Sequence, residues 1–502
     1  MTDKITKGGL LAAAAVVLAF ALPALGQQGP ESLLPEGFGD PAPSAPNNPA
    51  RPSSSSPSTT KTGTSPANPA SGDVSADAAA DDAEEDEEDA QEMVVRYDVP
   101  PAARRSLNAI GIISETSGGF PAASFGATNG AFLKQVVQRT TGPIASRWGT
   151  IMARRLLASR TNTPVGVNGA DWTAERAWLL LRMGDSVVAR GLVQQVDAGN
   201  YTKRLHEVAM QTYLANGDLA GICPLTEGGV RLVNSGRWKM SRAICASLAG
   251  EQGSATGFIN QGRYQGWVRG VDYLLTEKAV GAGINGRRSV KIEWDGVEGM
   301  NPWRFGLSAA VGLEPPEQLF SNSGRQIDGW RAQLPMFAPA IRAKYAPGAA
   351  ALGVFSNRDM VDLYAQVLDD PDAPDAMKTQ AENLGNAYTA SDDSGKVTAM
   401  ASIWGAERTS ADYLAALVMT ARAAALIKPS SDHAGQADGL IASMLTAGLD
   451  RSAARWSNIV SGGSLGWELG SLFMTFLGKP LRNLVSTKTL VTARASVVRF
   501  LP

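Results

Sequence analysis

The feature that most constrains this chain is a helix-ending signal that recurs at a fixed interval. A glycine followed by an acidic residue stands at three places 33 residues apart, at Gly184-Asp185, Gly217-Asp218 and Gly250-Glu251. Such a glycine ends a helix in the left-handed conformation, and the acid after it caps the start of the next helix. A period of 33 or 34 residues is the length of one helix pair. One pair cannot cover its own apolar face, so it must stack on the next.

Apolar residues between these turns have helical spacing. The first segment carries them at positions i, i+3, i+4 and i+7, as Ala174, Ala177, Trp178 and Leu181. Two further amphipathic segments lie within 188–196 and 205–213. Short helices joined by short turns pack antiparallel to their neighbours. The sequence therefore predicts an all-α protein.

Small residues stand where these helices would pack closely, at Ala177, Ala189 and Ala209. On these and on the glycine-acid turns, residues 171–262 resemble the tetratricopeptide-like helical-repeat superfamily, and uncharacterised exported alphaproteobacterial members in particular. The full tetratricopeptide pattern is absent, and Pro224 and Gly228-Gly229 interrupt the third unit. The resemblance implies an α-solenoid of stacked helix pairs.

Beyond residue 262 the helical pattern continues without a clear period. One segment reads as extended, because Asn285-Gly286 forms a turn pair and Val290, Ile292 and Trp294 alternate with charged residues. We expect at most one short β-hairpin, near residues 285–295, at the seam between two helical halves.

The start of the chain is typical of an exported protein. Residues 8–25 form an uncharged apolar run after Lys4 and Lys7, and Ala24-Leu25-Gly26 fits a signal-peptidase site. The alternative is an uncleaved anchor in the inner membrane. Composition sets apart a signal peptide (1–26) and a disordered linker (27–93). The expected hairpin divides the rest into an N-terminal helical-repeat domain (94–281) and a C-terminal helical domain (282–502). With the signal cleaved, we expect no integral membrane segment, and a periplasmic location.

The chain has two cysteines, Cys223 and Cys245, as many as one bridge requires. They lie on either side of the Ser235-Gly236 turn, so antiparallel helices would bring them to similar heights. An exported protein meets an oxidising compartment, which favours a Cys223–Cys245 disulfide. The alternative is two buried free thiols.

The sequence gives little support for a catalytic site or a metal site. The only histidines, His206 and His433, lie far apart, and neither has a second histidine or a cysteine at metal-ligand spacing. His206 stands among Lys203, Arg204 and Glu207 and is expected on the surface. Gly462-Gly463-Ser464-Leu465-Gly466 matches a nucleophile elbow, but both histidines precede Ser464. We expect no enzyme, no cofactor and no metal.

The charge distribution favours an anionic partner. Residues 1–92 contain 15 of the 48 acidic and 4 of the 46 basic residues, so the remaining 410 carry 33 acids and 42 bases, a net charge of +9. Exported proteins rarely meet nucleic acid, so a protein or an anionic envelope polymer is the expected partner. The candidate groove consists of Arg182, Arg190, Lys203, Arg204, Arg237 and Lys239. The chain's own acidic run, residues 81–89, would compete for it; the alternative is a tail that never docks.

Together these features predict a non-catalytic periplasmic scaffold or adaptor for assembly of the cell envelope, which binds partners through a helical-repeat surface. The alternative from another class is an envelope enzyme acting on polysaccharide or peptidoglycan through a pair of carboxylates.

Overall fold

The computed structural model describes Pro100 and residues 103–140, 144, 146–283, 290–405 and 411–476, with the backbone alone for 471–476. The chain divides into two units, residues 1–93 and 94–502. Every described residue belongs to the second unit, so the predicted signal peptide and linker lie outside the described residues.

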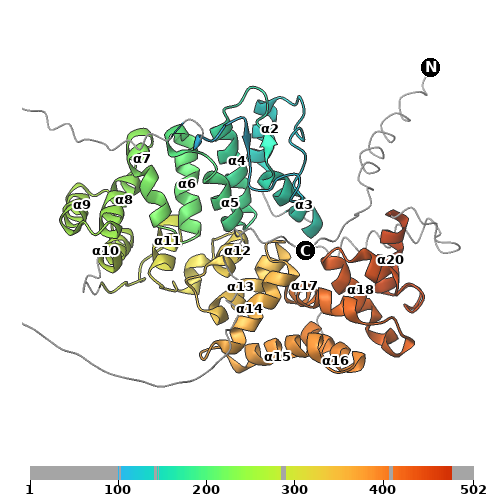
Figure 1. The fold of residues 1–502 in the computed structure, drawn as a ribbon. Coiled ribbons are helices and arrows are strands. Elements are labelled where there is room, and N and C mark those ends of the chain that lie inside the picture. The colour runs from blue at the N-terminus through green and yellow to red at the C-terminus, as the bar shows by residue number, and fades with distance from the viewer. Residues whose placement is uncertain are drawn as a thin grey trace, which may run out of the picture. The chain divides into compact units, whose positions relative to one another are not determined.

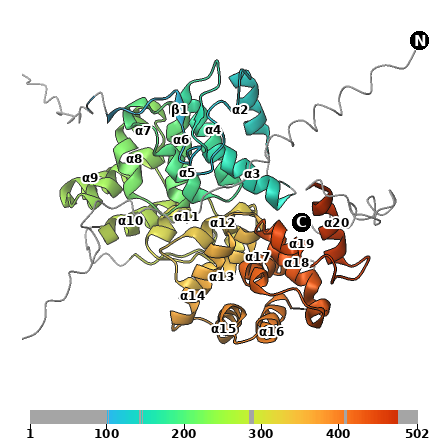
Figure 2. The same ribbon diagram turned by 45° about the vertical axis from the view of Figure 1, so that its right-hand side comes forward.

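The first part of this unit is a series of short helices (Figures 1 and 2). In chain order the helices are α2 (Gly130–Arg139), α3 (Arg147–Ala158), α4 (Gly169–Arg182), α5 (Ser186–Val193), η2 (Ala198–Asn200), α6 (Lys203–Ala215), η3 (Ala220–Leu225), α7 (Thr226–Leu232), α8 (Gly236–Leu248), α9 (Gln252–Gln265), α10 (Val271–Gly283), α11 (Pro302–Ala310) and α12 (Gln326–Gln333), with η4 (Glu317–Phe320) between the last two. Helices that are close in the chain pack against each other. For example, α4 packs on both α5 and α6, and α8 packs on α9.

The second part continues the same architecture. Its helices are α13 (Pro339–Ala351), α14 (Asn357–Asp369), α15 (Asp375–Thr389), α16 (Asp393–Trp404), α17 (Ala411–Leu426), η5 (Ser431–Gln436), α18 (Ala437–Thr446), α19 (Asp450–Ala454) and α20 (Leu465–Phe476). The predicted all-α class of stacked helices is confirmed. Among the described residues, no helix is both long and apolar enough to cross a membrane.

The glycine-acid turns end three helices in the same way. Gly184, Gly217 and Gly250 follow α4, α6 and α8 with φ of +86°, +61° and +80°. In each turn the acid's N–H donates to a carbonyl five residues back, 2.8–2.9 Å away, and the glycine's N–H donates to one three residues back. This is the hydrogen bonding of a helix end that requires a left-handed residue. The 33-residue recurrence in the sequence is therefore a recurrence of one backbone motif.

The one sheet in the described part of the chain has two residues per strand and lies far from the predicted hairpin. β1 (Ala109–Ile110) pairs antiparallel with β2 (Thr161–Asn162). At the predicted position, 284–289 lies outside the described residues and 290–294 contains no strand. The alternation there is real, because Ile292 and Trp294 pack on the core. These apolar side chains therefore pack on the core although the segment has no partner strand.

Two hydrophobic cores meet inside the unit. The first extends from Ile110 to Phe337 and the second from Ala332 to Trp456. The cores therefore change over at residues 332–341. The reason is that α11 packs on α6 and α12 packs on α5, which adds both helices to the N-terminal core. The domain boundary at 281/282, placed at the expected hairpin, stays a prediction.

Arg147 joins the two parts. Its buried guanidinium donates to the carbonyls of Ala350, Thr446 and Phe355 over 2.9, 2.9 and 3.0 Å. Ala350 and Thr446 are in the last turns of α13 and α18, where carbonyls lack partners within the helix and the helix dipole favours a cation. A residue of α3 thus closes the ends of two helices in the second part.

Candidate functional site

Two of the predicted basic residues, Arg182 and Arg204, come together where α4 and α6 pack against each other. Helical spacing puts Glu175, Trp178 and Arg182 of α4 on neighbouring positions of one face. The first turn of α6 brings Arg204 to the same place, and the last turn of α2 brings Gln138. We refer to these five residues as the Trp178 cluster.

A buried carboxylate anchors the cluster. Glu175 has no exposed surface, and its oxygens accept hydrogen bonds from Nε and Nη2 of Arg204, 3.1 and 3.3 Å away. A third bond comes from the Gln138 side-chain amide, 2.8 Å away. A buried carboxylate is tolerated when a charge and hydrogen bonds satisfy it. Glu175 therefore holds Arg204 in one orientation at the surface.

Two guanidinium groups flank the Trp178 ring. The Cζ atoms of Arg182 and Arg204 lie 5.9 and 5.8 Å from the ring centroid. Arg182 also donates to the carbonyls of Val137 and Gln138 at the end of α2. Burial lowers the pKa of Arg182; nearby Glu175 opposes this shift and nearby Arg204 adds to it. Two cations and an indole are thus held rigidly at a half-exposed surface, an arrangement suited to binding an anionic or aromatic group.

The six predicted groove residues lie in three different surroundings. Arg182 and Arg204 belong to the Trp178 cluster, and the exposed Lys203 precedes Arg204. Arg190, on α5, forms a 2.9 Å salt bridge with Asp218. On α8, Lys239 lies 6.0 Å from the Trp267 ring and Arg237 is exposed. The structure therefore concentrates the candidate site on three of the six residues.

Sequence reasoning missed Glu175. The residue lies between Ala174 and Ala177 on the apolar side of α4, and a carboxylate placed there needs a cation. The nearest arginine on the next helix of the stack, Arg204, supplies it. The signal in the sequence that could have revealed this ion pair is a single acidic residue within a stripe of apolar residues.

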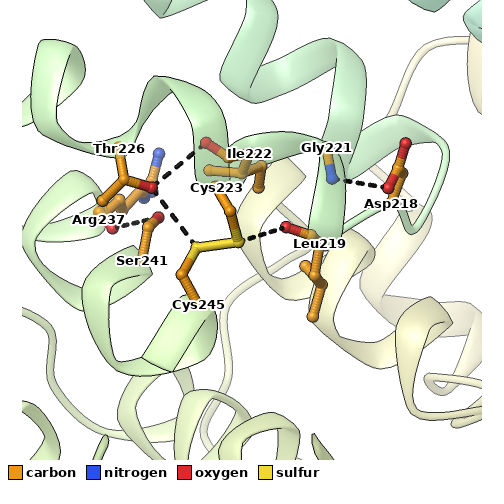
Figure 3. Close-up of a disulfide and its surroundings, with 9 residues drawn as sticks. All are labelled: Asp218, Leu219, Gly221, Ile222, Cys223, Thr226, Arg237, Ser241 and Cys245. Atoms are coloured by element: carbon orange, nitrogen blue, oxygen red, sulfur yellow. Dashed lines mark hydrogen bonds between the residues drawn. A yellow bond between two sulfur atoms is a disulfide. The ribbon is translucent and has the colours of Figure 1, made fainter. Parts of the chain in front are cut away.

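The two cysteines lie at disulfide distance, with S–S 2.11 Å (Figure 3). They join η3 to α8, and the Thr226 hydroxyl lies 3.5 Å from Cys245 Sγ. Cys223 is in a short 3-10 helix because Pro224 interrupts the α-helix, yet the predicted pairing is the one found.

Reducing the Cys223–Cys245 bridge is expected to lower the free energy of unfolding by about 3 kcal/mol, since the bridge closes a loop of about 22 residues in the unfolded chain. Urea unfolding with and without reductant measures this difference. The double variant Cys223→Ser/Cys245→Ser is the control and should be insensitive to reductant. Free thiols in the unfolded, non-reduced exported protein would contradict the prediction.

The Gly228-Gly229 interruption lets α7 pack on aromatic rings. A Cβ at Gly229 would lie 2.2 Å from the Trp238 ring, and one at Gly228 would lie 2.6 Å from His206 Nε2. His206 is 2 % exposed and packs edge-on between Tyr201 and Trp238. The prediction of a surface histidine is wrong, because position 206 lies on the inner face of α6 although its neighbours in sequence are charged.

Acid should weaken the fold through His206. Burial lowers its pKa below 6.5, and nearby Arg231 adds to this, against the hydrogen bond to the Thr202 carbonyl. The folded state therefore binds this proton less well than the unfolded state, so stability is complete above about pH 6.5 and falls below it. The melting temperature should decline as pH drops from 7 toward 5. His206→Phe should remove this decline, and His433→Gln should retain it; an unchanged decline in His206→Phe would contradict the assignment.

A second cluster contains a carboxylate pair of interest to the enzyme alternative. Glu314 and Glu317 both accept hydrogen bonds from the Tyr345 hydroxyl, 3.2 and 3.0 Å away. Arg331 lies between the Phe320 and Tyr345 rings and donates two bonds to Glu317. The hydrogen bonds from Arg331 lower the pKa of Glu317 to about 2. A carboxyl held ionised in this way does not suit a general acid.

An open polar hollow of about 560 Å³ lies between α15 and α16. Asp392 is the one carboxylate in its lining, and it accepts from the Gly395 N–H as the N-cap of α16. Ser464, from the nucleophile-elbow match, donates to Asp438 and accepts from the Trp467 N–H at the start of α20. Both side chains thus have structural roles in capping helices.

In the part of the chain that the structure describes, no group of three histidine, cysteine or acidic side chains could hold a metal ion. No protein-family model, no curated protein and no solved structure matches the chain.

Proposed function

We propose that this chain is an exported, non-catalytic scaffold or adaptor of the cell envelope, which binds an anionic partner at the Trp178 cluster. The observation that carries the proposal is the pair of arginines held near the Trp178 ring. The buried Glu175 holds Arg204, and the carbonyls at the end of α2 hold Arg182. Hydrogen bonds within the fold already restrict both guanidinium groups at the surface. Arginines fixed in this way recognise carboxylates or phosphates well, because little side-chain entropy is lost on binding.

The tetratricopeptide-like resemblance adds to this. Stacked helix pairs present an extended surface, which in helical-repeat proteins serves for binding. Periplasmic location follows from the N-terminal apolar run and agrees with the pairing of the cysteines. The acidic run at 81–89, attached to the same chain, would be a competitor of the partner at this surface.

The site is tested by capture of partners from envelope extracts on the purified protein. The double variant Arg182→Gln/Lys203→Gln leaves Glu175 paired with Arg204, and it should reduce capture several-fold at low salt. Arg237→Gln/Lys239→Gln removes the same charge from α8 and is the matched control; it should capture as the unchanged protein does. Equal capture by both variants and the unchanged protein would rule out the cluster as the binding site.

A further inference from the structure

The region around α2 and α3 combines a basic, acid-free sequence with exposed apolar side chains. Residues 116–170 contain no acidic residue and six basic ones. The same stretch contains a large share of the exposed large apolar side chains of the described chain, namely Phe132, Val136, Trp148, Met152 and Val165.

The two helices repeat one exposed pattern. On α2, Phe132 and Val136 are 60 % and 46 % exposed, and Arg139 follows. On α3, Trp148 and Met152 are 43 % and 63 % exposed, and Arg155 follows. In both cases the spacing is i, i+4 and i+7, so each helix presents a stripe of two apolar side chains ending in an arginine.

The opposite faces of both helices are committed to the fold. Val137 of α2 is buried, and α2 packs on α4. On α3, Leu157 and Ala158 are buried, and Arg147 binds the ends of α13 and α18. Figures 1 and 2 both show α2 and α3 on the same flank of α4. These contacts fix the orientation of both helices, and the edge of the partly exposed Trp148 ring also lies against Gly448.

Two of the six bases, Arg139 and Arg155, are exposed beside the stripes, whereas Arg147 is buried and Arg154 pairs with Asp185. Within the described part of the chain, Arg139 and Arg155 form no salt bridge. Bulky apolar side chains with arginines and no acid are the composition of surfaces that bind at the interface of anionic lipid bilayers. A protein partner carries both charges at fixed positions, and a surface that binds it usually contains acids as well as bases. An acid-free stretch of this length is better suited to a uniformly negative surface such as an anionic bilayer.

We infer that the α2–α3 flank is a membrane-docking surface, which inserts Phe132, Val136, Trp148 and Met152 among the headgroups of an anionic phospholipid bilayer. Arg139 and Arg155 pair with lipid phosphates. This surface is separate from the Trp178 cluster, and it would hold the scaffold at a membrane after its signal peptide has been removed.

The test is co-sedimentation with vesicles of phosphatidylethanolamine and phosphatidylglycerol, and with vesicles of phosphatidylcholine alone. The protein is the chain from Gln27, which retains the whole compact unit 94–502 and lacks the apolar run of the signal peptide. The protein should sediment with the anionic vesicles and stay in solution with the neutral ones.

Three double variants locate the surface. Phe132→Ala/Val136→Ala and Trp148→Ala/Met152→Ala should each weaken binding roughly tenfold, and Arg139→Gln/Arg155→Gln by roughly twentyfold. The control is Leu368→Ala/Leu426→Ala, which removes equally exposed leucines from α14 and α17 and should bind normally. Unchanged melting temperatures show that the variants are folded.

Two results would overturn the inference. One is the absence of sedimentation with anionic vesicles, as expected if this flank takes a protein partner. The other is binding that the α2 and α3 variants leave as strong as that of the control.

Discussion

Replacing Arg176 by methionine should lower the free energy of unfolding by about 3 to 5 kcal/mol. Arg176 is fully buried in α4, with no carboxylate bound to it, and donates to the carbonyls of Leu157, Ile110 and Ser159 over 2.6–2.9 Å. Burial lowers its pKa to about 9, so it stays charged at neutral pH. Methionine fills much of the volume but donates to none of the three carbonyls, of which that of Ser159 also accepts from a further donor, the Thr161 N–H at 3.0 Å.

Arg160→Met is the control for this substitution. Arg160 is exposed and directly precedes β2, the strand that pairs with Ile110. Its loss should change stability by no more than about 0.5 kcal/mol. Urea unfolding followed by circular dichroism measures both variants. Equal stability of the two variants would show that the carbonyls find other donors.

Replacing Arg147 by alanine should cost about 3 kcal/mol and should also separate the unfolding of the two cores. The three carbonyls it binds belong to the part of the unit that contains the second core, whereas α3 packs on α4 and α5 of the first. Burial and the neighbouring Arg154 lower the pKa of Arg147 to about 10. Calorimetry should show one transition for the unchanged protein and two for the variant.

Arg358→Ala is the matched control for Arg147→Ala. Its side chain is largely exposed and pairs only with Asp362 one turn away, so the single transition should remain. A single transition in Arg147→Ala, at an unchanged temperature, would show that other contacts couple the two cores.

The helix ends were predictable because their cause is local. A glycine at the left-handed position determines the backbone over a few residues, and all three predicted turns have the same backbone hydrogen bonds. The predicted capping by the acid is found at Asp185, which accepts from the Val188 N–H, but not at Glu251, whose side chain makes no capping bond at the start of α9. The extended segment at 290–294 shows the limit of local reasoning. Its alternation is correct, but a strand also needs a partner, and partners come from tertiary structure.

The surroundings of single polar residues were less predictable. The charged neighbours of His206 in the sequence suggest a surface position. Helical spacing instead places it with Ala209 and Tyr213 on the buried side of α6. Among the predicted groove residues, Arg190 of α5 forms a salt bridge with Asp218 in the turn after α6. No sequence pattern indicates that these two residues meet. Glu175 and Arg204 meet because α4 and α6 stack, which depends on the whole fold.

The most direct test of the proposed scaffold is photo-crosslinking in intact cells that express the protein with a photoreactive amino acid at position 203 or at position 358. Lys203 adjoins the Trp178 cluster, and Arg358 is an exposed position on α14. We expect adducts of defined mass from position 203, weakened by Arg182→Gln, and none of the same mass from position 358. The absence of an adduct from position 203, or the same adducts from both positions, would contradict binding of a partner at the cluster.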